Sequence, residues 1–286
     1  MGPGPASRTL GIMLAHARLT ADRPRGPEAR EGATRILRMR SQAPLILRPT
    51  RQRAPAALRH WNLDPDRCAG VSIVAGAAGP LGGDHLRLDV EVKAGASLIV
   101  RAVAATLVLP GPHGLESRSE VNIKVASGGT LVWLPGKQIL AERCYHEALT
   151  RIDLEDGARL FAREELVLGR HGETPGAVRQ RLRLTYDGIA SHDQELAVGE
   201  GAIGWDSSAV TGGRRALGSV LIVDPESTGP ADAQPPAPED VPDTAVMALD
   251  SRSVLVSSLA EDSILLSRQL DASLAGYVRQ EEADRV

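Results

Sequence analysis

Short segments in which apolar and polar residues alternate are the feature that most limits the fold of this chain. Residues 86–92 and 121–125 both place an apolar side chain at every second position. Successive side chains of an extended strand point to opposite faces, so a period of two indicates strands with one buried face. We therefore expect a mainly β protein.

Glycine turns separate these strands at nearly regular intervals. Gly95, Gly128 and Gly157 lie 33 and 29 residues apart, and Gly188 follows after a further 31. Glycine supplies the positive φ that a tight corner needs. The regular spacing favours a layered or β-helix-like stack of hairpins, in which each unit covers the apolar face of the next. Hairpins of a meander in an ordinary β-sandwich explain the spacing equally well.

Two stretches interrupt the strand pattern. Residues 1–34 contain four prolines and five arginines without an apolar period, which predicts a disordered N-terminal tail. Residues 225–242 contain six prolines and are expected to form a loop. Too few residues follow this loop to make a second domain, so residues 35–286 are expected to form a single β domain.

The end of the chain changes to a helical period. A capping-box pattern runs from Ser258 to Glu261 and predicts the start of a helix of about five turns. Apolar residues then recur at three- and four-residue steps: Leu266, Leu270, Leu274, Tyr277 and Val278. We expect this apolar stripe to pack on the sheet of its own chain, with docking to a partner as the alternative.

Composition argues against several kinds of partner. Aromatic residues make up 2% of the chain, which leaves few rings for stacking on nucleic-acid bases. A formal charge of −3 provides no strong attraction to nucleic acid or to an anionic membrane. Cys68 and Cys144 are too few for a disulfide framework and fit a reducing compartment. The sequence also lacks an apolar run of about 18 residues, so we expect a cytoplasmic protein.

The common catalytic signatures are missing as well. Residues 136–138 lack the upstream glycine and the hydroxyl of a phosphate-binding loop. In residues 76–83, Pro80 stands where a dinucleotide-binding fold would begin a helix. The G-x-S-x-G, H-E-x-x-H and C-x-x-C motifs are absent. We therefore expect Gly82 and Gly83 to form a structural turn and the protein not to be an enzyme.

One pair of residues has the chemistry of metal ligands. Cys144 and His146 are two positions apart, so on a strand they share a face and offer sulfur and nitrogen to a borderline metal. A lasting site needs more ligands than two. A surface histidine beside a half-buried cysteine is the favoured alternative.

Adjacent carboxylates provide a second candidate. Glu164 and Glu165 lie within the strand-like segment 160–168, and adjacent strand residues point to opposite faces, so one of them must face inward. A buried carboxylate has to be paired, hydrated or bound to a metal. The alternatives are an ion pair with a nearby arginine (Arg163, Arg179 or Arg181) and a hydrated cavity or ion path lined by Glu164.

Four motifs in the same order resemble those of the urease accessory protein D family (UreD/UreH). They are Gly79-Pro80-Leu81-Gly82-Gly83-Asp84 before a strand, Ala104-Ala105-Thr106, Trp133-Leu134-Pro135 with Ile139-Leu140, and Glu164 with Leu168-Gly169-Arg170. The resemblance covers residues 35–280. The chain departs from the family pattern at Leu107, where lysine is usual, at Arg163, where tryptophan is usual, and at residues 136–137.

This resemblance implies a β-helical or layered fold and a scaffold without catalytic residues. Members of the family join apo-urease to the helical urease accessory protein F and the GTPase urease accessory protein G. A water-filled internal passage is thought to carry Ni²⁺, which is bound transiently and is not a permanent cofactor. Asp84 and Glu164 would be the carboxylates along it, and the C-terminal helix or the loop 225–242 would meet the other accessory proteins.

A function of another class remains open at this point. Parallel β structures often act on sugars, and two carboxylates such as Asp84 and Glu164 are what a carbohydrate-active hydrolase or lyase needs. The low aromatic content counts against this alternative, because sugar sites usually contain stacking rings.

Overall fold

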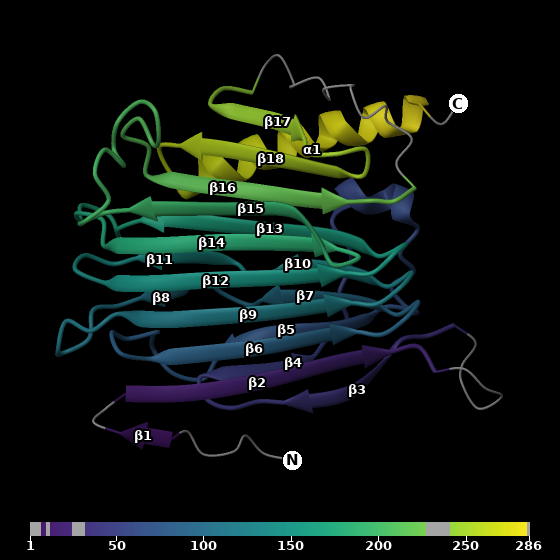
Figure 1. Cartoon of the computed structure of the whole chain (residues 1–286), viewed down its shortest axis with the longest axis horizontal. Helices are drawn as coiled ribbons and strands as arrows, with labels where there is room; N and C mark the ends of the chain where they lie inside the picture. The colour runs from purple at the N-terminus through teal and green to yellow at the C-terminus, as the bar shows by residue number, and fades with distance from the viewer. Residues whose placement is uncertain (1–6, 10–11, 25–31, 227–240, 285–286) are drawn as a thin grey trace.

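The computed structural model describes residues 7–9, 12–24, 32–226 and 241–284. These residues form two β-sheets that lie one behind the other, with a core between them (Figure 1). One sheet has eight strands: β1 (Ser7–Thr9), β2 (Ile12–Asp22), β3 (Arg35–Arg40), β6 (His85–Val92), β9 (Ser117–Val125), β12 (Tyr145–Leu154), β14 (Ala177–Tyr186) and β15 (Ile189–Val198).

The other sheet has ten strands. They are β4 (Leu45–Pro49), β5 (Ala69–Ala75), β7 (Ser97–Ala102), β8 (Thr106–Val108), β10 (Thr130–Leu134), β11 (Lys137–Leu140), β13 (Arg159–Leu168), β16 (Ala216–Val223), β17 (Thr244–Ala248) and β18 (Ser253–Ala260). Two helical elements, the 3-10 helix η1 (Ala56–Trp61) and the helix α1 (Ser263–Asp284), complete the described fold. The expectation of a mainly β protein with one C-terminal helix is confirmed.

The chain coils between the two sheets. Strands β6, β9, β12 and β14 are parallel neighbours in one sheet, and β7, β10 and β13 are parallel neighbours in the other. The chain passes from β6 to β7, from β9 to β10 and from β12 to β13, so each coil crosses from the eight-stranded sheet to the ten-stranded sheet. This is the β-helix-like arrangement that the regular glycine spacing favours.

The glycine turns are the corners of these coils. Gly95, Gly128 and Gly157 all have positive φ, as expected, but they connect strands of different sheets, whereas Gly188 joins the antiparallel pair β14 and β15. The corners also bond to each other, because Gly95 N donates to Ser127 O and Gly128 N donates to Asp156 O. The local sequence indicates a tight turn both at the corners and at the β14–β15 hairpin. Pairing between successive coils decides whether the turn becomes a corner or a hairpin.

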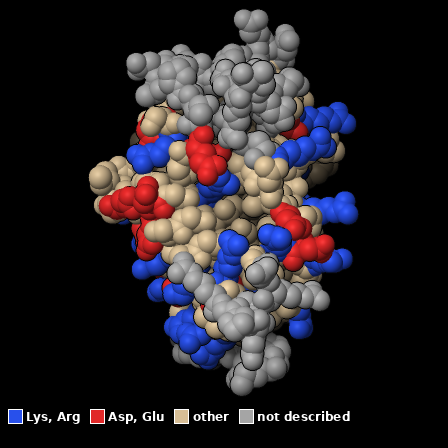
Figure 2. Space-filling model, turned by 90° about the vertical axis from the view of Figure 1, so that its right-hand side faces the viewer, with Lys and Arg blue, Asp and Glu red and all other residues tan. Residues whose placement is uncertain are grey.

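Figure 2 shows the end of the molecule where these corners lie. Lys and Arg side chains are interspersed with Asp and Glu side chains across the described part of this surface. Most of the charges along the sheets also pair across or within strands, as in Arg181 with Asp193 at 2.8 Å. The described part of this end thus lacks the one-signed field that would attract a phosphate polymer.

The prediction of a disordered tail over residues 1–34 is wrong for the described part of that segment. Strand β2 pairs in parallel with β6, and Ala17, Leu19 and Ala21 are almost completely buried. The apolar period of two continues through β2, but small alanines make up much of it and weaken the signal. Strand β2 therefore belongs to the same sheet and core as β6. Residues 25–31 lie outside the described residues, as do residues 227–240 of the proline-rich loop.

The C-terminal helix packs on its own sheet, as expected. Leu266, Leu270 and Leu274 of α1 are buried against apolar residues on the outer face of β16 and β18, such as Val220 and Val256. The side chains of Tyr277 and Val278 lie outside the described residues. No helix among the described residues is long and apolar enough to cross a membrane.

The predicted capping box is wrong. Ser258 lies within β18, and its hydroxyl bonds to Gln269. Asp262 caps the helix instead, because its Oδ1 accepts the backbone N–H of Ile264 at 2.7 Å and of Leu265 at 2.8 Å. An aspartate directly before the apolar stripe was the better sequence signal.

Gly218 sets how closely α1 approaches the sheet. A Cβ at this position would lie 2.8 Å from Leu270 Cδ1 and 3.2 Å from Leu266 Cδ2. We expect Gly218→Ala to lower the free energy of unfolding by about 1–3 kcal/mol through overpacking, as measured by urea denaturation. In a Leu270→Ala background Gly218→Ala should cost less, since the clashing Leu270 atoms are gone. Strictly additive effects of the two substitutions would contradict this packing.

Candidate functional site

A polar layer crosses the core between the sheets. On one side of it is an apolar cluster that contains Ala162 and Leu182, and on the other side is a cluster that contains Leu166 and Val178. Between them, inward-facing polar residues come from both sheets: Ser119, Thr150, Glu164, Gln180, Ser219 and Ser257. We call this set the polar layer. Each sheet therefore keeps its alternating pattern but places polar side chains in one band of the interior.

Glu164 lies in the middle of this layer. Its Oε1 accepts a hydrogen bond from Thr150 Oγ1 at 2.8 Å, and its Oε2 accepts one from Gln180 Nε2 at 2.7 Å. Both donors belong to the opposite sheet, so the carboxylate ties the two sheets together. Burial raises the pKa of Glu164 above its ordinary value, although the two hydrogen bonds act in the opposite direction.

No counter-charge meets this carboxylate among the residues that the structure describes. Of the three arginines considered as its partner, Arg163 pairs with Glu165 and Asp271. Arg179 pairs with Glu195, and Arg181 pairs with Asp193. The expected ion pair of Glu164 is therefore wrong. The three arginines and Glu165 lie on the outer faces of the sheets. Because side chains alternate between the two faces of a strand, these residues cannot point into the interior.

Water can reach Glu164. The residue keeps intermediate exposure although it lies in a densely packed part of the molecule. Glu164 is the register partner of Ser219 on β16, which in turn is the partner of Ser257 on β18. Both serines also keep intermediate exposure. This row of polar groups runs across the ten-stranded sheet toward its edge strand β17, at the top of Figure 1.

Several other buried polar atoms lack a hydrogen-bond partner in the described part of the chain. They include Gln138 Oε1, Trp133 Nε1, His146 Nε2 and His192 Nε2. Gln138 and His192 both face inward, because their register partners Leu166 and Leu184 belong to the core. A buried unpaired polar atom costs free energy unless water or a ligand satisfies it. The interior is thus suited to hydrated or ionic contents.

The raised pKa of Glu164 has a measurable consequence. A carboxyl whose pKa is higher in the folded than in the unfolded protein destabilises the fold as pH rises from the ordinary glutamate range through the folded pKa. We therefore expect Glu164→Gln to become progressively more stable than the wild type over that pH interval. Urea unfolding at a series of pH values measures the difference. A constant difference would mean that Glu164 titrates as it does in the unfolded chain.

His146 is buried, contrary to the expected surface position. Its Nδ1 is 2.8 Å from Ser117 Oγ, and that hydroxyl is also 3.3 Å from the Tyr145 carbonyl oxygen, to which it donates. Ser117 therefore accepts the Nδ1 proton. Burial lowers the pKa of His146 to about 4, so the ring is neutral at pH 7 and its unpartnered Nε2 carries a lone pair.

Cys144 is a poor metal ligand. It is completely buried, and burial raises the pKa of its thiol to about 11, so the thiolate that would bind a metal is scarce at pH 7. It also precedes β12 and sits in a turn, where its N–H donates to Ala141 O. The argument that strand geometry places Cys144 and His146 on one face therefore does not apply.

Asp84 clamps a turn. It is buried, and its Oδ1 accepts Met13 N–H at 2.8 Å while its Oδ2 accepts Leu81 N–H at 2.9 Å. These bonds fix the predicted turn at Gly82 and Gly83 and attach it to β2. A Cβ at Gly82 would lie only 2.5 Å from the Leu115 carbonyl oxygen, so glycine is required there.

The two candidate carboxylates are far apart. By register, Asp84 lies at the level of Ser117 and His146, whereas Glu164 bonds to Thr150, four residues further along β12. Four residues of strand span about 13 Å. Paired catalytic carboxylates of glycosidases are roughly 5 to 9.5 Å apart. The structure does not bring Asp84 and Glu164 together, and this separation weighs against the carbohydrate-active alternative.

Sequence comparison identifies the relatives of this fold. The chain is 43% identical over 246 residues to the urease accessory protein UreD of Streptomyces avermitilis, covering 85% of this chain and 91% of that protein. It is 39% identical over 263 residues to UreD 3 of Streptomyces griseus, covering 91% and 95%. It is 36% identical over 269 residues to UreD of Frankia casuarinae, covering 85% and 84%.

The family profile described as UreD urease accessory protein matches residues 15–285. The match begins within β2, so the expectation that the family resemblance starts at residue 35 is wrong. Both this expectation and the predicted disordered tail overlooked strand β2. The agreement in sequence therefore extends over both sheets and the helix. The chain belongs to the UreD urease accessory protein family.

Proposed function

We propose that this protein is a non-enzymatic scaffold of urease maturation that carries Ni²⁺ toward apo-urease through its interior. The relatives described above are all named urease accessory proteins. One observation supports this passage. Glu164 is an interior carboxylate that keeps partial exposure and has no counter-charge among the described residues. A cation moving through the polar layer would supply the missing positive charge.

The chemistry of the layer fits a cargo that must leave again. Ni²⁺ accepts oxygen and imidazole nitrogen ligands, and Glu164 offers carboxylate oxygens held by two neutral donors. Gln138 Oε1 and the Nε2 atoms of His146 and His192 are further neutral donor atoms in the interior. Few ligands at any one point mean weak binding, which permits both entry and exit. We leave Cys144 out of the passage because its thiol stays protonated.

The partners that follow from this role are apo-urease, the helical urease accessory protein F and the GTPase urease accessory protein G. Ile264 and Leu265 at the start of α1 are 63% and 38% exposed, which makes this end of the helix a candidate contact for one of the accessory proteins. Both cysteines are free thiols, as they would be in the cytoplasm, where we place the protein.

The direct test is a strain in which the gene is deleted and then restored. We expect the deletion strain to contain urease protein that is poor in nickel and inactive, and the restored gene to recover both nickel content and activity. The measurements are urease activity and the nickel content of the purified enzyme. Fully loaded urease in the deletion strain would show that this protein is not needed for nickel delivery.

A further inference from the structure

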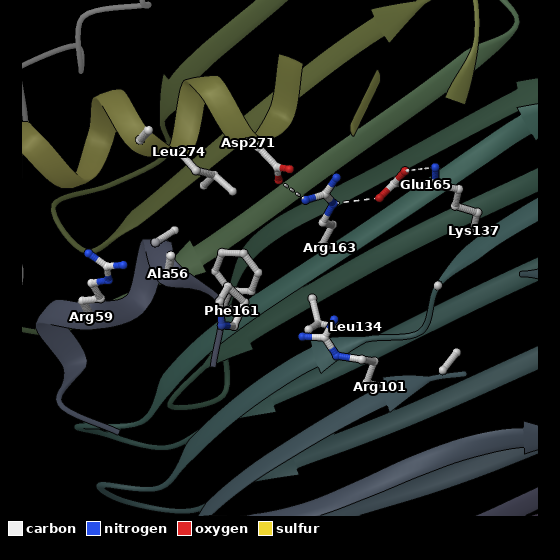
Figure 3. Close-up of a pocket in the computed structure, with 15 residues that line it drawn as sticks. Ala56, Arg59, Arg101, Leu134, Lys137, Phe161, Arg163, Glu165, Asp271 and Leu274 are labelled. Carbon is white, nitrogen blue, oxygen red and sulfur yellow. Dashed lines mark hydrogen bonds and ion pairs between the residues drawn. The ribbon is translucent and has the colours of Figure 1, made fainter. Parts of the chain in front are cut away.

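A pocket of about 820 Å³ lies on the outer face of the ten-stranded sheet, between η1 and α1 (Figure 3). Phe161 and Leu134 from the sheet, Ala56 from η1 and Leu274 from α1 provide apolar walls. This face is opposite to the polar layer, because Phe161 and Glu164 are an odd number of positions apart on β13. The pocket is therefore separate from the interior passage.

Most of the charged groups in this pocket satisfy one another. Arg163 bonds to Glu165 at 2.7 Å and to Asp271 at 2.6 Å, which connects the sheet to α1. Lys137 donates to the Ser263 carbonyl oxygen at 2.9 Å and lies 3.7 Å from Glu165. These four side chains form a closed network, drawn with dashed lines in Figure 3. They leave little charge for a ligand.

Arg59 and Arg101 are different. Both are exposed, and neither guanidinium group has a hydrogen bond or ion pair within the described part of the chain. Figure 3 shows Arg59 on one side of Phe161 and Arg101 on the other. The pocket thus has an apolar centre flanked by two uncompensated guanidinium groups. A ligand that matches it carries two separated negative charges and an apolar group between them.

We propose that this pocket binds an acidic segment of a partner protein, with one carboxylate at Arg59, one at Arg101 and an apolar side chain against the accessible surface of Ala56 and Leu134. Guanidinium groups hold carboxylates through paired hydrogen bonds, and the apolar wall adds buried area. A compact polyanion such as phosphate fits poorly, because it would gain nothing from the apolar lining and would meet the carboxylates of Asp271 and Glu165 in the same pocket. The proposal rests on the scaffold part of the proposed function and does not depend on nickel passage.

The test uses the full-length protein and short fluorescein-labelled peptides. The acidic peptide carries an acidic residue on either side of a leucine, and its matched control has amides in place of the carboxylates. We expect the acidic peptide alone to bind, with an affinity that falls as salt concentration rises. Fluorescence anisotropy gives both affinities. Equal binding of the two peptides, or no binding of the acidic one, would overturn the proposal.

Substitutions then place the peptide in the pocket. The double variant Arg59→Gln/Arg101→Gln should weaken binding of the acidic peptide at least about tenfold. Arg48→Gln, which removes an exposed arginine on β4 whose side chain has no ion pair among the described residues, should leave the affinity unchanged. The charge-reversed variant Arg59→Glu/Arg101→Glu should gain binding to a peptide with lysines in place of the acidic residues. Unfolding curves for each variant verify that the fold is kept.

Two outcomes would count against the pocket as a protein-binding site. Unchanged affinity in the double glutamine variant would locate the peptide elsewhere, and displacement of the peptide by inorganic phosphate at similar concentration would indicate a small-anion site. The titration contains neither nickel nor urease. Its failure therefore leaves the passage proposal intact, and failure of nickel delivery leaves this proposal intact.

Discussion

Glu164→Gln is expected to leave urease protein abundant but poor in nickel, with activity reduced roughly 10- to 100-fold, as is usual when a residue that supports metal handling is lost. Glutamine keeps the shape of the side chain and the hydrogen bond from Thr150, and a flip of the Gln180 amide preserves the second bond. Only the negative charge in the polar layer disappears. The measurement is the nickel content and activity of urease from a deletion strain that carries the variant gene.

The control for this experiment is Glu147→Gln. Glu147 lies on β12 and forms an ion pair with Arg118 on the outer face of the same sheet, and an exposed pair of this kind contributes little to stability. We expect normal nickel loading with this variant. Full urease activation by Glu164→Gln would mean that the interior carboxylate serves only to tie the sheets together, and the protein would then be a plain interaction module.

Leu19→Ala is expected to have the largest effect on stability of the substitutions considered, because Leu19 is 1% exposed in the main core. Removing a buried leucine side chain costs about 2–5 kcal/mol through lost burial and the cavity left behind. Leu14 lies on the same strand and is 48% exposed, so Leu14→Ala is the matched control. Urea unfolding of both variants gives the comparison.

This pair of variants decides whether the N-terminal segment belongs to the folded domain. We expect the unfolding midpoint to fall sharply for Leu19→Ala and to change little for Leu14→Ala. Equally small shifts of the midpoint for both variants would show that residues 12–22 are not part of the folded core. The turn at Gly82 and Gly83 also depends on the answer, because β2 donates the Met13 N–H that holds Asp84.

Local periodicity predicted the strands at residues 86–92 and 121–125, the positive φ of the glycine corners and the existence of α1, since each depends on neighbouring residues alone. The same parity argument correctly required an inward carboxylate among Glu164 and Glu165. Its hydrogen-bond donors could not be predicted, because Thr150 and Gln180 belong to the opposite sheet and only the coil brings them near. The role of Asp84 was hidden for a similar reason: its partner Met13 is 71 residues away.

Sequence patterns were least informative where two elements meet. The polar layer is visible only when β13, β16 and β18 are aligned, and the register that aligns Glu164, Ser219 and Ser257 is a property of the whole sheet. The pocket beside Phe161 likewise combines residues of η1, α1 and the sheet. Both features are set by tertiary packing, which leaves no local periodic signal.

The register of the polar row also limits how this family can change in length. Side chains alternate between faces with a period of two, so one inserted residue inside β13 or β16 would turn every following side chain to the other face. Glu164 and Ser219 would then be separated even with their identities preserved. Natural length variants should therefore gather at the coil corners and leave these strands intact. Relatives that keep this polar row should therefore keep the lengths of these strands as well as the identities of their polar residues.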